Sequence, residues 1–74
     1  MSEGTEQMVE ERLRLEKLIE HWAEHNDEHT ARFKEPAGKA SDMGLPGVAE
    51  ELKGAAEAGR KVSEHLRSAM EKVG

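Results

Sequence analysis

The sequence contains no cysteine and no tyrosine, and it has a single tryptophan, a single phenylalanine and two prolines in 74 residues. The absence of cysteine excludes disulfide bonds and thiolate metal sites. So few large apolar side chains cannot fill a sizeable core, and a domain of this size usually needs a metal or a partner chain for stability. The composition therefore predicts one small domain over residues 1–74.

The chain also lacks an excess of basic residues and any long apolar run. Its formal net charge of −5 and isoelectric point near 5.3 argue against nucleic-acid binding, which requires a basic surface. No segment approaches the roughly 18 apolar residues of a membrane-spanning helix, and the N-terminus lacks the basic-then-apolar order of a signal peptide. We expect a cytoplasmic protein that binds neither nucleic acid nor membranes.

The chain is rich in helix-forming residues that follow a helical periodicity, and we therefore expect an all-α fold. A first stripe, with steps of three and four residues, comprises Met8, Leu15, Leu18, Ile19, Trp22, Asn26, His29, Phe33, Ala37 and Ala40. This stripe predicts a first helix over about 5–42, in which Pro36 is either a kink or the end of the helix. The kinked helix is favoured because Ala37 and Ala40 continue the same face.

A second stripe predicts a second helix over about 47–73 and comprises Val48, Leu52, Ala55, Gly59, Val62, Leu66, Ala69 and Val73. The turn is expected at 43–46, because Gly44 suits the left-handed end of one helix and Pro46 the first turn of the next. Two long helices joined by a short turn form an antiparallel, coiled-coil-like αα-hairpin. Its remaining apolar flank predicts a homodimer in which two hairpins form a four-helix bundle.

The segment HWAEHNDEH places His21, His25 and His29 at intervals of four residues. These side chains therefore climb one side of the helix in successive turns, with Trp22 at the centre of the seam and His29 almost within it. Imidazole nitrogen is a preferred ligand of zinc, copper and nickel. The row predicts a metal site, and a second chain would supply ligands that one helix cannot present without strain.

Several of these residues also have simpler explanations. A solitary surface histidine is usually solvated, which is one interpretation of His65, although it lies near the level of Trp22 and is a candidate to complete the site. Trp22 and Phe33 are interpreted as core residues, and Gly59 as room for a close approach to His29. The sequence has no arrangement typical of a catalytic centre, and we expect a protein that is not an enzyme.

The motif HWxxHxxxH, formed by His21, Trp22, His25 and His29 on an acidic amphipathic helix, resembles that of the CooJ-type nickel accessory proteins of carbon monoxide dehydrogenase. The resemblance implies a dimeric, coiled-coil-like protein that holds Ni(II) at its subunit interface and passes it to the enzyme. It implies that the three histidines are ligands and that Trp22 packs beside the metal. Members of that family can carry a histidine-rich C-terminal tail, which the last residues here do not resemble.

Three functions fit these features. The first is a nickel metallochaperone that delivers Ni(II) for maturation of a nickel enzyme, with that enzyme or its maturation factors as partners. The second is a helical interaction module with incidental histidines, and the third is a zinc- or copper-binding helical protein. Ligand type does not separate nickel from zinc or copper, so nickel follows from the resemblance alone.

Overall fold

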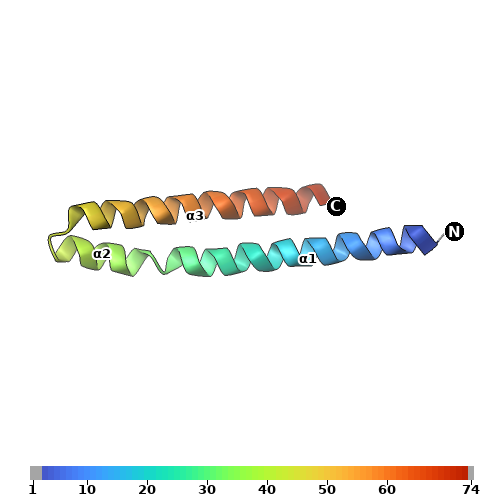
Figure 1. Ribbon diagram of the computed structural model, residues 1–74, viewed down its shortest axis with the longest axis horizontal. Coiled ribbons are helices and arrows are strands. Elements are labelled where there is room, and N and C mark those ends of the chain that lie inside the picture. Colours follow the sequence, from blue (N-terminus) through green and yellow to red (C-terminus); the bar gives the residue numbers. More distant parts are fainter. Residues whose placement is uncertain (1–2, 74) are drawn as a thin grey trace.

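The computed structural model describes residues 3–73, except for the side chains of Glu3 and Thr5. Three helices follow one another: α1 (Glu3–Ala31), α2 (Lys34–Asp42) and α3 (Pro46–Val73). Helices α1 and α2 lie end to end along α3, so that the chain forms an antiparallel hairpin with extents of 66 × 14 × 11 Å (Figure 1). The prediction of an all-α hairpin is confirmed over the described residues, which include no strand.

The turn between α2 and α3 has the geometry that its glycine and proline predict. Gly44 has a φ of 74°, and its N–H donates to the carbonyl of Ser41 at 3.0 Å. The next N–H, that of Leu45, donates to the carbonyl of Ala40 at 2.8 Å. These two bonds satisfy the last carbonyls of α2 in a Schellman motif. Pro46 then begins α3, where a missing N–H costs nothing.

The long first helix is interrupted at Arg32 and Phe33, ahead of Pro36. Pro36 has no N–H for the carbonyl of Arg32, and its ring would collide with that carbonyl in a continuous helix. The N–H groups of Arg32 and Phe33 donate instead to carbonyls three residues back, at 3.1 and 3.2 Å. The single helix expected over about 5–42 is therefore two helices, and Pro36 lies in the first turn of α2, where no N–H is needed.

A seam of mostly small residues holds the hairpin together. Its buried members are Ile19, Ala23, Ala37, Ala40, Ala49 and Ser63. In the middle of the seam, a Cβ added to Gly59 would overlap the hydroxyl of Thr30, so the two helices approach closely there. Trp22 is 48% exposed, and the prediction that it is a core residue of the hairpin is wrong. The seam on α1 runs through Ala23 instead.

The two sides of this seam differ in character. On one side, the residues that directly precede four of the buried positions are apolar and 43–49% exposed: Leu18, Trp22, Val48 and Val62. On the other side, the residues that directly follow the same positions are all glutamates: Glu20, Glu24, Glu50 and Glu64. A step of one residue along a helix turns the side chain by about 100° about the helix axis. When two helices are antiparallel, a step toward the C-terminus turns the side chains of both helices toward the same side of the pair.

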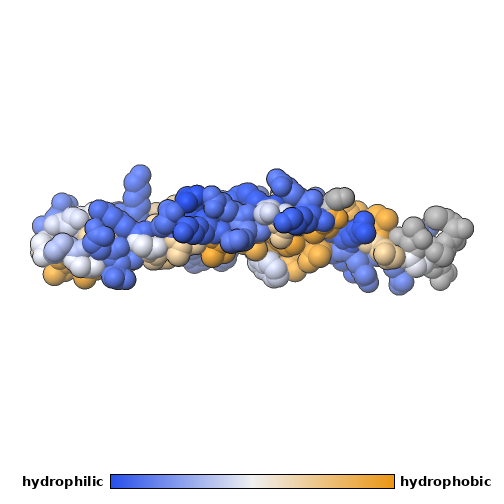
Figure 2. Space-filling view, turned by 90° about the horizontal axis from the view of Figure 1, so that it is seen from above, coloured by the Kyte–Doolittle hydropathy of each residue, from blue (hydrophilic) through white to orange (hydrophobic). Residues whose placement is uncertain are grey.

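The hairpin therefore has an apolar face, defined by Leu18, Trp22, Val48 and Val62, and a charged face opposite to it. Figure 2 shows this division from above α3: the outer side of α3 is mainly hydrophilic, and hydrophobic residues gather along one edge of the molecule. An apolar face of this kind is suited to contact with another protein surface.

The N-terminal part of α1 extends beyond the end of α3 (Figure 1). Its apolar side chains Met8, Val9 and Leu13 are each more than half exposed, at 58%, 54% and 53%. Among the described residues, no helix combines the length and the apolar character that crossing a bilayer requires.

Candidate metal centre

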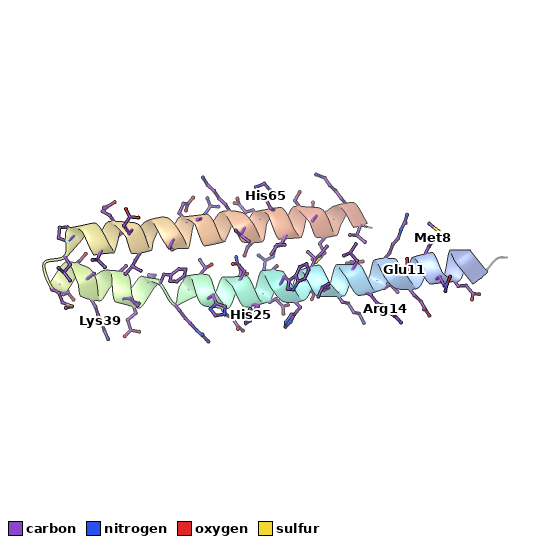
Figure 3. The ribbon with its side chains drawn as sticks, viewed as in Figure 1. Met8, Glu11, Arg14, His25, Lys39 and His65 are labelled. Carbon is purple, nitrogen blue, oxygen red and sulfur yellow. The ribbon has the colours of Figure 1, made fainter. Side chains whose placement is uncertain are left out.

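The histidine row lies on an uninterrupted part of α1, which has no glycine or proline between Thr5 and Ala31. The backbone spacing of His21, His25 and His29 is therefore that of a regular helix, one turn apart. All three side chains are exposed. Figure 3 shows His25 pointing outward from α1, on the side away from α3.

The rings of His25 and His29 converge. Their Nε2 atoms are 3.0 Å apart, and their ring centroids are 4.5 Å apart with an interplanar angle of 79°. Two imidazole nitrogens that bind one ion at about 2.1 Å, with an angle of about 90° between them, are about 3 Å apart. Without a metal, the same distance is a hydrogen bond in which one ring N–H donates to the bare nitrogen of the other ring.

His21 stands beside this pair without joining it. Its ring lies nearly parallel to that of His25, with an interplanar angle of 15° and a centroid distance of 6.0 Å. Within residues 3–73, no three histidine, aspartate or glutamate side chains converge on one point. The structure thus brings together two of the three predicted ligands and places the third on the preceding turn.

The histidine pair borders the apolar face. His25 and His29 directly precede Asn26 and Thr30, which face α3. Trp22, on the apolar face, likewise directly precedes Ala23, which lies in the seam. His29 was expected almost in the seam and opposite Gly59, but it is exposed, and Thr30 occupies that place. The row consequently lies on the outer side of the hairpin, where solvent and other chains reach it.

His65 is remote from the row. Figure 3 shows it pointing outward from α3, on the opposite side of the hairpin from His25. Within one chain, His65 therefore does not complete a site with the histidine pair.

A group of polar residues joins α1 to α3 at the level of the histidine pair. The Asn26 side-chain amide donates to the carbonyl of Gly59 at 2.7 Å and to Ser63 Oγ at 2.8 Å. The Ser63 hydroxyl donates in turn to Asp27 Oδ1 at 2.5 Å. Arg67 forms an ion pair with the other carboxylate oxygen of Asp27 at 2.6 Å. We refer to Asn26, Asp27, Ser63 and Arg67 as the interhelix polar cluster.

Hydrogen bonds from Arg67 and from Ser63 lower the pKa of Asp27, because both favour the charged carboxylate. Sequence reasoning did not identify this cluster as a unit. The available signal was Asn26, a polar residue within an otherwise apolar stripe, whereas nothing in the periodicity distinguished Ser63 from its apolar neighbour Val62.

An open apolar groove of about 660 Å³ lies where the break between α1 and α2 faces α3. Its lining includes Ala31, Phe33, Lys53 and Arg60. Ala31 and Arg60 directly follow the seam residues Thr30 and Gly59, so the groove opens on the charged face. It is therefore separate from the histidine pair, which borders the opposite side.

Comparison with known proteins assigns the chain to a family. Residues 15–73 match DUF8180, a family described as a domain of unknown function, and this match includes the histidine row and all of α2 and α3. The chain is also similar to an uncharacterized protein of Archaeoglobus fulgidus, with 44% identity over 61 residues that cover 82% of this chain and 97% of the relative. No solved structure matches. The chain belongs to the DUF8180 family.

Proposed function

We propose that this protein is a nickel-binding accessory protein without enzymatic activity. His25 and His29 bind Ni(II) as cargo, His21 is a further ligand, and the ion is passed to a nickel enzyme or its maturation factors. The observation that carries the proposal is the 3.0 Å separation of the two Nε2 atoms. The resemblance of the motif to that of CooJ-type proteins supports nickel as the metal and carbon monoxide dehydrogenase as the recipient.

The geometry of the pair supports a metal with cis ligands at right angles. A separation of 3.0 Å matches the distance of about 3 Å expected in square-planar or octahedral coordination. Tetrahedral coordination, which zinc prefers, would place the two nitrogens somewhat farther apart. Copper(II) shares the tetragonal preference of nickel, so a copper-binding protein of the same architecture is a competing interpretation.

The homodimer is part of this proposal. Two imidazoles fill only part of a coordination shell of four or six, and a second copy can supply the remaining ligands. The pair borders the apolar face, and two hairpins that pack by this face would form a four-helix bundle. In a dimer whose axis passes near the row, histidines of both copies approach one another at the interface.

A helical interaction module is the second candidate function. The observation that favours it is the apolar face itself, whose four residues are 43–49% exposed and suited to a partner helix. In this case the histidines are incidental, and neither stability nor oligomeric state depends on metal.

Isothermal titration of the metal-free protein with NiCl₂ tests the proposal. We expect Ni(II) to bind at one ion or fewer per chain. Sedimentation of the same protein should show a dimer. Affinity should decrease strongly in the His25→Ala and His29→Ala variants and less in the His21→Ala variant. His65→Ala is the matched control, because it removes an exposed histidine on the other side of the hairpin.

Binding that His25→Ala and His29→Ala leave unchanged would contradict the site. Parallel titrations with Zn(II) and Cu(II) measure selectivity for the metal.

A further inference from the structure

We propose that the interhelix polar cluster positions the metal site. It fixes the rotation of α1 on α3 that keeps Trp22, His25 and His29 outside the hairpin. For nickel binding, this inference rests on the proposed function, whereas the rotation itself can be measured without metal.

The apolar pattern does not by itself select the observed rotation of α1. A rotation by one residue would place Trp22 where Ala23 lies and His29 where Thr30 lies. That arrangement would bury Leu18 and Trp22, which are 43% and 48% exposed, in place of Ile19 and Ala23. In an isolated hairpin, the exchange of Ala23 for Trp22 would bury more apolar surface, so an interaction that requires the observed rotation has to oppose it.

The hydrogen bonds of Asn26 are such an interaction. Its amide bonds to Gly59 and Ser63, at 2.7 and 2.8 Å, require the side chain to point directly at α3. A rotation of about 100° would carry the amide out of the seam and break both bonds. Ser63 is 3% exposed, so its hydroxyl would lose its partners in a position shielded from water, which is costly. A polar residue in an apolar seam is a known means of selecting one packing arrangement.

The cluster acts at the position of the metal site. Asn26 and Asp27 lie between His25 and His29 in the sequence, and both are bonded to α3. The turn of α1 that carries the converging rings is therefore the turn that the cluster fixes. Loss of the cluster would turn His29 toward the seam and separate the site from the apolar face.

The test is the double variant Asn26→Ala/Ser63→Ala. Trp22 is the only tryptophan, so its fluorescence reports the rotation of α1 directly. At a dilution where sedimentation shows monomers, we expect unchanged helical circular dichroism. The emission should shift to shorter wavelength, and quenching by acrylamide should decrease, because Trp22 moves into the seam. The affinity for NiCl₂ should decrease by about tenfold or more, as when supporting residues of metal sites are removed.

Arg60→Gln is the control. It removes the ion pairs of Arg60 with Glu57 and Glu64, which lie within α3, and should leave both the emission and nickel binding unchanged. A helical double variant with wild-type emission and quenching overturns the inference, even if it melts at a lower temperature, since a merely stabilising role does not move Trp22.

If the double variant does not fold, Ser63→Ala alone is judged by the same measurements. If the wild-type protein binds no nickel, the proposed function fails, but the emission of Trp22 still decides the rotation.

Discussion

Arg67 binds Asp27 across the hairpin, with 2.6 Å between Nη2 and Oδ2, and thereby ties the C-terminal part of α1 to the C-terminal part of α3. Ser63 donates a hydrogen bond to the other oxygen of the same carboxylate. These contacts hold the pKa of Asp27 below its ordinary value of 3.8. The pairing of the two helices is therefore linked to the charge of one side chain.

This linkage predicts how acid affects the hairpin. A carboxylate whose pKa is lowered by folding stabilises the folded state above the unfolded pKa, and the contribution is lost as the pH falls through the folded pKa. For Asp27 the loss occurs below about pH 3.8. Urea unfolding of the metal-free protein should show wild type more stable than Asp27→Asn near neutral pH, with the difference disappearing in stronger acid. A difference that is the same at all pH values would contradict this origin.

Two glycines of α3 should respond in opposite ways to substitution by alanine. Gly59→Ala should lower the free energy of unfolding by about 1–3 kcal/mol, because the added methyl group overlaps the Thr30 side chain, which has to shift within a closely packed seam. Gly54 has nothing within 4 Å of the position of a Cβ, so Gly54→Ala should stabilise the helix by up to about 1 kcal/mol. Thermal or urea unfolding measures both changes. Equal effects at the two positions would show that the helices are not in close contact at Gly59.

Nickel binding should weaken steeply in acid. An imidazole binds a metal ion only in its neutral form, and histidine ordinarily becomes protonated around pH 6.5. Below roughly pH 6, each imidazole that must lose a proton to bind the ion adds about a tenfold decrease in affinity per pH unit. Titrations at several pH values should therefore give a steep dependence for wild type and a shallower one for His25→Ala. Identical slopes would exclude His25 as a ligand.

The apolar face predicts a substitution that separates the dimer. Val62→Glu places a charge on this face, where a second hairpin would bury it, and should convert the dimer to monomers in sedimentation experiments. Gly54→Glu is the matched control, because it adds the same charge at an exposed position of α3 with open space around a Cβ, about 140° around the helix from the buried Ala49, and should leave the dimer intact. A Val62→Glu protein that remains dimeric would place the interface elsewhere.

Sequence alone predicts most of the fold, because helical periodicity and turn chemistry are local properties. Gly44 and Pro46 predict the turn correctly, and Ile19 and Asn26 lie on the side of α1 that faces α3, as their spacing indicates. The position of the break is less direct, since Pro36 acts on the carbonyl four residues before it.

The rotation of the helices could not be read from the periodicity. Trp22 and Ala23 are neighbours, and a wide apolar stripe is compatible with either of them at its centre. In the structure, Ala23 lies in the seam and Trp22 does not. One of the interhelix hydrogen bonds of Asn26 is accepted by Ser63, which lies 37 residues farther along the chain. The histidine row was evident from its spacing, but the convergence of only His25 and His29 depends on side-chain conformations that a sequence pattern does not contain.

The turn at Gly44 also has a kinetic consequence. Residues that face each other across the hairpin enclose a loop of chain, and this loop becomes longer with distance from the turn. Closure of short loops is fast and entropically inexpensive, so we expect pairing to begin beside Gly44 and to propagate toward the termini. The free N-terminal turns of α1 would be the first to fray in amide hydrogen exchange, while the turns that carry the histidines remain helical.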